Sequence, residues 1–274
     1  MPSPQVQPPV RRRTLLTLGA AVLVGGCAPG GGNPATTIAT TGSGSAAPPW
    51  SSAATGRTSD PSRTPDAGIC PTSPDVIPKP GTLQYLPCHD RDIALTIDDG
   101  PHPVWTPQVL ALLARHDIRA TFCVIGQNVA THPDLVKRVL DGGHQIANHT
   151  YTHPMNLATM SSALVDGQIH RTTDLVTRAG GPVPTLFRAP GGAWSAAILA
   201  SASAAGMRAL DWSVDTRDWS RPGVAHIVDV LLTKTHPGSI ILDHDGGGDR
   251  SQTVTALTTA LPRLIDQGYR FVLP

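Results

Sequence analysis

From Arg91 to the C-terminus, short apolar segments alternate with longer amphipathic ones, and this alternation restricts the possible folds more than any other feature of the chain. Strands and helices that alternate in this way are typical of parallel α/β domains, built as an open sheet or as a barrel. The apolar segments predict strands over residues 93–97, 120–125, 145–148, 185–187, 208–212, 239–242 and 270–273.

The amphipathic segments between these strands predict helices, and turn residues support several of them. Pro133 stands before one helical pattern, whereas Gly142, Gly180 and Gly206 follow others. Polar residues follow nearly every strand, at the end where barrel enzymes keep their sites, so the pattern favours a barrel over an open sheet. The expected helices cover residues 106–115, 134–140, 162–178, 195–205, 223–234 and 251–267.

Composition excludes some classes of function. The net charge of +1 over 274 residues argues against a nucleic-acid partner. All 20 acidic residues are aspartates, and a chain without glutamate cannot form the His-Glu-x-x-His helix of metalloproteases.

The N-terminal residues predict an export signal over residues 1–26. Arg12 and Arg13 resemble a twin-arginine motif, and the apolar run 14–26 is too short to span a membrane as a mature helix. This run ends at Cys27 in a sequence that resembles a bacterial lipobox, which predicts lipidation of Cys27 and a stable membrane anchor. The alternative is an ordinary signal peptide with an incidental cysteine.

Residues 27–69 predict a flexible linker, because Gly, Pro, Ser, Thr and Ala predominate and large apolar residues are almost absent. We expect a single catalytic domain over residues 70–274. Outside the cytoplasm, we expect Cys70 and Cys88 to form a disulfide around a Pro-rich segment. Cys123 lies within an apolar run, which predicts a buried thiol.

Two adjacent carboxylates, Asp98 and Asp99, end the first strand of this domain, before the turn signal Gly100-Pro101. Two like charges so close are costly to ionise together, so this position needs a cation. By itself the Asp-Asp-Gly-Pro sequence is also consistent with a simple loop opening.

Two histidines four residues apart, His149 and His153, follow the predicted strand 145–148. On a helical turn this spacing places both imidazoles on one face, at a separation suited to one metal ion. Two imidazoles and one carboxylate make a site for Zn²⁺ or another divalent first-row ion, with positions left open for water and substrate.

Polar residues follow later strands as well. Arg188 would pair with one aspartate of the cluster and hold it ionised, while Gly191 and Gly192 can bring backbone N–H groups close to an oxyanion. The segments Asp215-Thr216-Arg217-Asp218-Trp219 and Leu242-Asp243-His244 come next.

Together these segments resemble the five ordered motifs of the polysaccharide deacetylases, carbohydrate esterase family 4. The resemblance covers about the whole of the predicted domain and implies a distorted (β/α)7 barrel. The motifs are Thr96-Ile97-Asp98-Asp99-Gly100, His149-Thr150-Tyr151-Thr152-His153, Arg188-Ala189-Pro190-Gly191-Gly192, Asp215-Thr216-Arg217-Asp218-Trp219 and Leu242-Asp243-His244.

The resemblance also implies a role for each motif residue. Asp98 would be the general base, oriented by Arg188, and His244 the general acid, tuned by Asp215. A divalent metal, Zn²⁺ before Co²⁺, Ni²⁺ or Mn²⁺, would be held by Asp99, His149 and His153. Contacts to the oxyanion and the substrate would come from Gly191, Trp219 and Leu242.

The implied activity is hydrolysis of N-acetyl groups on an amino-sugar polysaccharide, either cell-wall peptidoglycan or chitin-like oligomers. The chain departs from the family at Gly191, where an aromatic residue is common; a glycine still offers its backbone N–H but changes the wall of the sugar groove. We expect an exported, membrane-anchored monomer that faces the cell wall. The alternatives are an O-acetyl esterase of the acetylxylan type and a non-catalytic lipoprotein that binds the cell wall.

Overall fold

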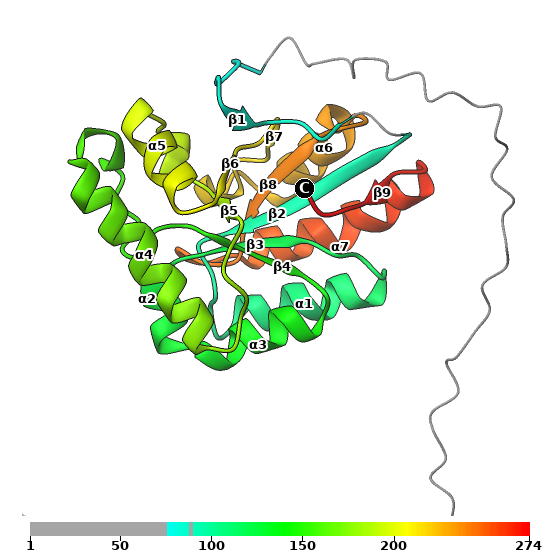
Figure 1. The fold of residues 1–274 in the computed structure, drawn as a ribbon. Coiled ribbons are helices and arrows are strands. Elements are labelled where there is room, and N and C mark those ends of the chain that lie inside the picture. Colours follow the sequence, from blue (N-terminus) through cyan, green and yellow to red (C-terminus); the bar gives the residue numbers. More distant parts are fainter. Residues whose placement is uncertain (1–75, 88–89) are drawn as a thin grey trace, which may run out of the picture. The chain divides into compact units, whose positions relative to one another are not determined.

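A parallel sheet runs through residues 76–87 and 90–274, the part of the chain that the computed structural model describes (Figure 1). Its strands follow the order β1-β6-β5-β4-β3-β2-β8-β7, and β9 pairs separately with β2. Every pairing between named strands is parallel. The strands are β1 (Thr82–Leu83), β2 (Asp92–Asp98), β3 (Thr121–Val124), β4 (Gln145–Asn148), β5 (Leu186–Phe187), β6 (Arg208–Leu210), β7 (Val214–Asp215), β8 (Ile240–His244) and β9 (Arg270–Phe271).

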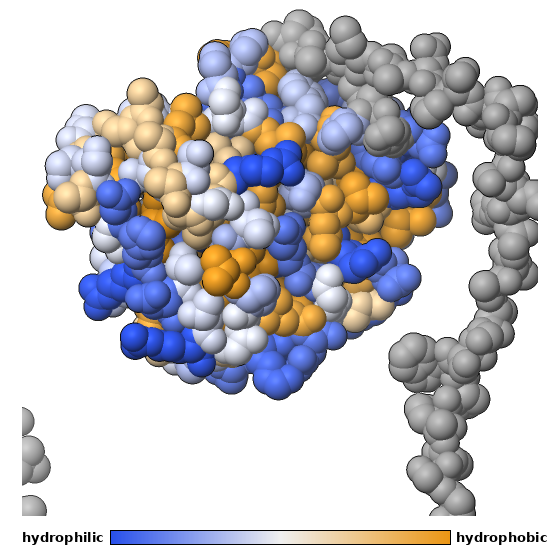
Figure 2. Space-filling model, viewed as in Figure 1, coloured by the Kyte–Doolittle hydropathy of each residue, from blue (hydrophilic) through white to orange (hydrophobic). Residues whose placement is uncertain are grey.

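Helices alternate with the strands and cover the sheet. In Figure 1, α1, α3 and α7 lie along one side of it, and α4 and α5 lie beyond β4 and β5. In the same view, hydrophilic residues cover most of α3 and the lower part of α4 (Figure 2). The helices are α1 (Trp105–Arg115), α2 (Gly126–Thr131), α3 (Pro133–Asp141), α4 (Ser162–Arg178), α5 (Ala196–Ala204), α6 (Val224–Lys234) and α7 (Ser251–Asp266).

The structure confirms the α/β prediction as a curled parallel sheet, a distorted half-barrel. All seven predicted strands and all six predicted helices are present, with bounds shifted by no more than a few residues. The sequence missed β1, β7 and the six-residue helix α2, which are too short to carry a hydrophobic period. Among the described strands, β1 and β7 end the order, so the sheet is curled rather than closed.

Strand β2 is buried on both faces, and its successive side chains alternate between the two. Ile93, Leu95 and Ile97 belong to the main hydrophobic cluster under the helices. Thr96 and Asp98 have the opposite parity, and the Thr96 hydroxyl donates to the carbonyl of Ile241 at 2.6 Å. This alternation places Asp98 on the inner face of the curled sheet, opposite the apolar core.

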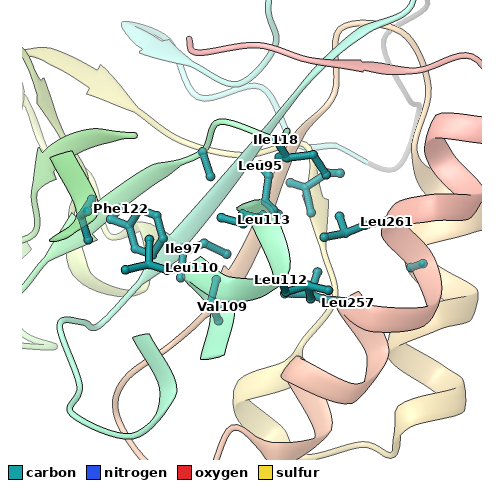
Figure 3. Close-up of a cluster of buried hydrophobic side chains, with 14 of the residues drawn as sticks. Leu95, Ile97, Val109, Leu110, Leu112, Leu113, Ile118, Phe122, Leu257 and Leu261 are labelled. Carbon is teal, nitrogen blue, oxygen red and sulfur yellow. The ribbon is translucent and has the colours of Figure 1, made fainter. Parts of the chain in front are cut away.

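The main core lies between β2, β3 and helices α1 and α7 (Figure 3). Leu95 and Ile97 meet Leu113 of α1, and Leu257 and Leu261 of α7 pack on the same cluster. All five side chains are fully buried. The core therefore fixes the position of β2, and with it the two aspartates at its end.

Several predictions concern residues outside the described part of the chain. These are the signal over residues 1–26, the linker 27–69, the domain start at residue 70, lipidation of Cys27 and the pairing of Cys70 with Cys88. Within the described part, Cys123 is a buried free thiol, as expected. Across the described residues, every helix is too short or too polar to serve as a membrane span.

We expect Leu113→Ala to lower the free energy of unfolding by about 3 kcal/mol, because it removes a fully buried side chain and leaves a cavity beneath β2. Leu164→Ala on α4 is the control, since Leu164 is 56% exposed. Urea unfolding of both variants measures the difference. Equal losses would show that the α1 face does not form the core.

Candidate active site and metal centre

Polar side chains from the carboxyl ends of β2, β4, β5 and β8 meet at one edge of the sheet. Strands β2 and β8 are neighbours, and their register sets Asp98 directly beside His244. His149 and Arg188 directly follow β4 and β5. The parallel order thus brings together residues that lie far apart in the sequence.

Asp99, His149 and His153 form a cluster in which one possible ligand atom of each residue lies within 4.8 Å of the others. The Asp99 Oδ1 atom is 3.6 Å from His149 Nε2 and 3.2 Å from His153 Nε2. Asp99 and His153 have φ angles of 72° and 55°, so both adopt the left-handed conformation that turns their side chains to this point.

The three residues fit a divalent metal ion. The Asp99 Oδ1 atom is buried and has no hydrogen-bond donor among the described residues. The His149 Nδ1 lies 2.8 Å from the carbonyl oxygen of Arg188 and donates to it, which leaves the Nε2 lone pair facing Asp99. Burial opposes ionisation of Asp99, but His149 and the other nearby histidines lower its pKa below the ordinary value. One carboxylate and two imidazoles are therefore held as a metal centre.

Asp98 is paired with a fully buried arginine. The Arg188 Nη1 donates to Asp98 Oδ1 at 2.7 Å and lies 2.8 Å from Thr96 Oγ1, while Nη2 donates to the carbonyl of Asp211 at 3.0 Å. Burial acts to raise the pKa of Asp98, but the Arg188 charge more than offsets it and leaves the pKa lowered. Asp98 is therefore ionised, with its Oδ2 atom 3.6 Å from His149 Nε2.

His244 is paired with Asp218. The Nδ1 of His244 donates to Asp218 Oδ1 at 2.7 Å, and its backbone N–H donates to Oδ2 at 2.9 Å. The Thr253 hydroxyl also donates to Oδ2, at 2.7 Å. Burial lowers the pKa of His244, but the hydrogen bond and charge of Asp218 outweigh this and raise it to about 9. His244 is therefore held protonated at neutral pH.

This contact corrects the sequence interpretation, which assigned the tuning of His244 to Asp215. Asp215 ends β7, and its Oδ1 atom accepts the backbone N–H of Arg217 at 2.8 Å. Arg217 then turns the chain with a φ of 54°, and Asp218 is the carboxylate that reaches β8. The spacing within the motif could not distinguish the two, because the choice depends on this turn.

A cavity of about 530 Å³ lies over the cluster. It is lined by the predicted substrate residues Gly191, Trp219 and Leu242, and by Asp215. Trp219 is 48% exposed at its rim, whereas Leu242 is buried. The structure therefore brings every predicted site residue within its described part to one cavity or, for Arg188, to the buried wall behind Asp98.

Gly191 adopts a φ of 60°, and its backbone N–H makes no hydrogen bond within the described residues. A Cβ atom at this position would lie 2.8 Å from the Cε of Met155, which also lines the cavity. Met155 thus occupies the space next to Gly191 where a larger side chain would stand. The sequence interpretation did not include Met155.

A glycine loop after β8 was also missed. A Cβ atom at Gly246 would overlap the backbone carbonyl group of Asp99, so this loop packs directly on the metal-binding aspartate. Arg250 follows the loop, is 4% exposed and lines the cavity. The three consecutive glycines 246–248 after Leu242-Asp243-His244 were the available signal.

Comparison with known proteins agrees with this geometry. The model of the family described as polysaccharide deacetylase matches residues 87–210. A chitooligosaccharide deacetylase of Rhizobium leguminosarum bv. trifolii is 44% identical over 191 residues, which cover 66% of this chain and 88% of the relative. A peptidoglycan-N-acetylglucosamine deacetylase of Bacillus cereus is 44% identical over 189 residues, 68% of this chain and 88% of the relative.

The solved structure of the Bc1960 peptidoglycan N-acetylglucosamine deacetylase superposes with a TM-score of 0.66 at 37% identity. The match covers 69% of this chain and 88% of that one. From the motifs, the fold and these relatives, we conclude that the chain belongs to the polysaccharide deacetylase family.

Proposed function

We propose that this protein removes N-acetyl groups from glycans that contain N-acetylglucosamine, either peptidoglycan or chitin-like oligomers. The observation that carries the proposal is the arrangement of Asp98 and His244 on neighbouring strands beside Asp99, His149 and His153. Relatives that are 44% identical deacetylate chitooligosaccharides and peptidoglycan N-acetylglucosamine, which supports this class of substrate.

Asp99, His149 and His153 would hold the metal ion, for which we propose Zn²⁺ because two imidazoles and one carboxylate are a common catalytic zinc set. When bound, such an ion supplies Lewis-acid activation of water and of the acetyl carbonyl. Asp98 takes the proton of the attacking water, and Arg188 keeps Asp98 ionised for this step.

Negative charge then develops on the carbonyl oxygen of the acetyl group. The free backbone N–H of Gly191 can donate a hydrogen bond to this oxygen. A donor of this kind lowers the activation free energy by about 3 kcal/mol. His244 gives its proton to the departing amine, and Asp218 stabilises the imidazolium until that transfer. The products are acetate and a glucosamine unit.

Acetate release from purified peptidoglycan, from chitin oligomers and from O-acetylated xylan tests this function. We expect release from the N-acetylated glycans, loss of activity after chelation, and recovery with Zn²⁺ that exceeds recovery with Co²⁺, Ni²⁺ or Mn²⁺. Release from xylan alone would assign the site to ester hydrolysis. No release from any of the three after metal add-back would refute catalysis.

Asp98→Asn should leave the metal bound and lower kcat by about a hundredfold or more, because the carboxylate that takes the proton is lost while the metal cluster keeps its three residues. His149→Ala should instead lose the metal. Metal content and acetate release separate the two effects. Asp90→Asn, at an exposed aspartate, is the control for general effects of a lost carboxylate.

Asp218→Asn should shift the alkaline limb of the pH profile of kcat/KM downward. The active form of His244 is protonated, so activity falls as the pH rises through its pKa, which Asp218 raises to about 9. Without that carboxylate the pKa of His244 moves back toward about 6.5, and activity is lost at lower pH. Asp215→Asn, the matched control, should move this limb much less, since Asp215 makes its hydrogen bond to Arg217. Equal shifts would return the tuning role to Asp215.

A further inference from the structure

Arg250 is an almost fully buried cation at the catalytic cavity, and the chemistry proposed above does not use it. The residue is 4% exposed and lines the cavity. Its Nε donates to the carbonyl oxygen of Gly246 at 2.6 Å, which fixes the guanidinium on the glycine loop. Its terminal Nη1 and Nη2 groups make no hydrogen bond or ion pair with the described residues. A buried guanidinium with free donors at a cavity wall is suited to bind a ligand oxygen.

The facing group is the second carboxylate oxygen of Asp99. Its Oδ1 atom faces His149 and His153, whereas Oδ2 receives no hydrogen bond from any described residue. Gly247 marks the gap between the two residues: a Cβ atom there would lie 2.6 Å from Asp99 Oδ2 and 3.2 Å from Arg250 Nη2. Gly247 has a φ of 70°, a conformation that disfavours any side chain, so the gap stays open.

The Asp99 carboxylate and the Arg250 guanidinium are separated by a gap and have opposite hydrogen-bonding roles. These two features indicate which chemical group of a ligand fits between them. Asp99 and Arg250 form no ion pair in the described structure, although both reach the same point beside Gly247. One side of the gap accepts a hydrogen bond and the other side donates one. A hydroxyl group satisfies both, because it donates its proton and offers lone pairs. A carboxylate does not, because Asp99 would repel it.

We propose that Arg250 is a substrate-binding residue that, together with Asp99, binds a hydroxyl of the same sugar ring that carries the acetamido group. The inference rests on the proposed function, because that function places the acetamide over Asp98 and the metal cluster. Asp99 belongs to this cluster through Oδ1 and borders the gap beside Arg250 through Oδ2, so the hydroxyl in the gap lies close to the acetamide. The hydroxyl must then sit on a carbon next to the acetamido carbon. Within a glycan chain one of these carbons forms the glycosidic bond, which leaves the 3-hydroxyl.

This contact selects among the sugars of a cell wall. N-Acetylglucosamine has a free 3-hydroxyl, whereas N-acetylmuramic acid carries a lactyl ether on that oxygen. The ether has no proton for Asp99, and its carboxylate would lie beside the carboxylate of Asp99. Arg250 therefore restricts the enzyme to N-acetylglucosamine units.

The test pairs a change in the protein with a change in the substrate. Arg250→Gln and the wild type are compared on chitotetraose, on its 3-O-methyl counterpart and on p-nitrophenyl acetate, which has no sugar. Each change alone should lower kcat/KM for the glycan about tenfold or more, and the two together should cost little more than one. Activity on p-nitrophenyl acetate and the bound metal content should stay unchanged. Arg221→Gln is the control, since Arg221 is 57% exposed and pairs with Asp249 next to Arg250.

Binding provides a readout that does not depend on turnover. Calorimetry with metal-loaded Asp98→Asn should show chitotetraose binding that weakens about tenfold or more when Arg250→Gln is added. If the wild type released no acetate but this difference persisted, the proposed function would fail and the binding role would stand. Equal losses on p-nitrophenyl acetate, lost metal, additive effects of the two changes or unchanged binding would each overturn the proposal for Arg250.

Discussion

The ion pair between Arg188 and Asp98 is the contact on which the catalytic arrangement depends. Both residues are buried, and a buried charge is tolerated only when a partner and further hydrogen bonds compensate it. Arg188 meets this requirement with Asp98, Thr96 and a backbone carbonyl. Because Thr96 and Asp98 share one face of β2 and Arg188 follows β5, the pair also locks β2 to the opposite side of the curled sheet.

A second ion pair, between His244 and Asp218, keeps a residue at the end of the neighbouring strand β8 protonated. Asp98 is held ionised by a cation, whereas His244 is held protonated by the carboxylate of Asp218. A base and an acid are therefore present together at neutral pH, which is the condition for taking a proton from water and giving one to an amine. The parallel register of β2 and β8 sets the two residues side by side, so the core that fixes this register also positions the catalytic groups.

The residues that could be predicted from the sequence lie at the ends of strands with a clear hydrophobic pattern. Asp98, His149 and His244 were found because parallel strands end at one edge of a sheet, and the ordered motifs identified the family. Asp218 was missed in favour of Asp215 because a left-handed turn at Arg217 decides which carboxylate reaches β8. A left-handed turn at a non-glycine residue does not change the pattern of apolar residues, so it could not be predicted from that pattern.

The walls and the floor of the cavity are built from different kinds of structural element. The floor comes from strand ends fixed by the core, whereas Met155 stands in a turn, Gly191 in the short 3-10 helix Pro190–Gly192 and Arg250 at the start of α7. The positions of these wall residues depend on close contacts between loops. Met155 occupies the space beside Gly191, and Gly247 leaves room between Asp99 and Arg250. Changes at such positions alter which glycan fits without disturbing the register that aligns acid, base and metal ligands. The reaction is thus set by the core of this fold, and the choice of sugar by the few loop residues that border it.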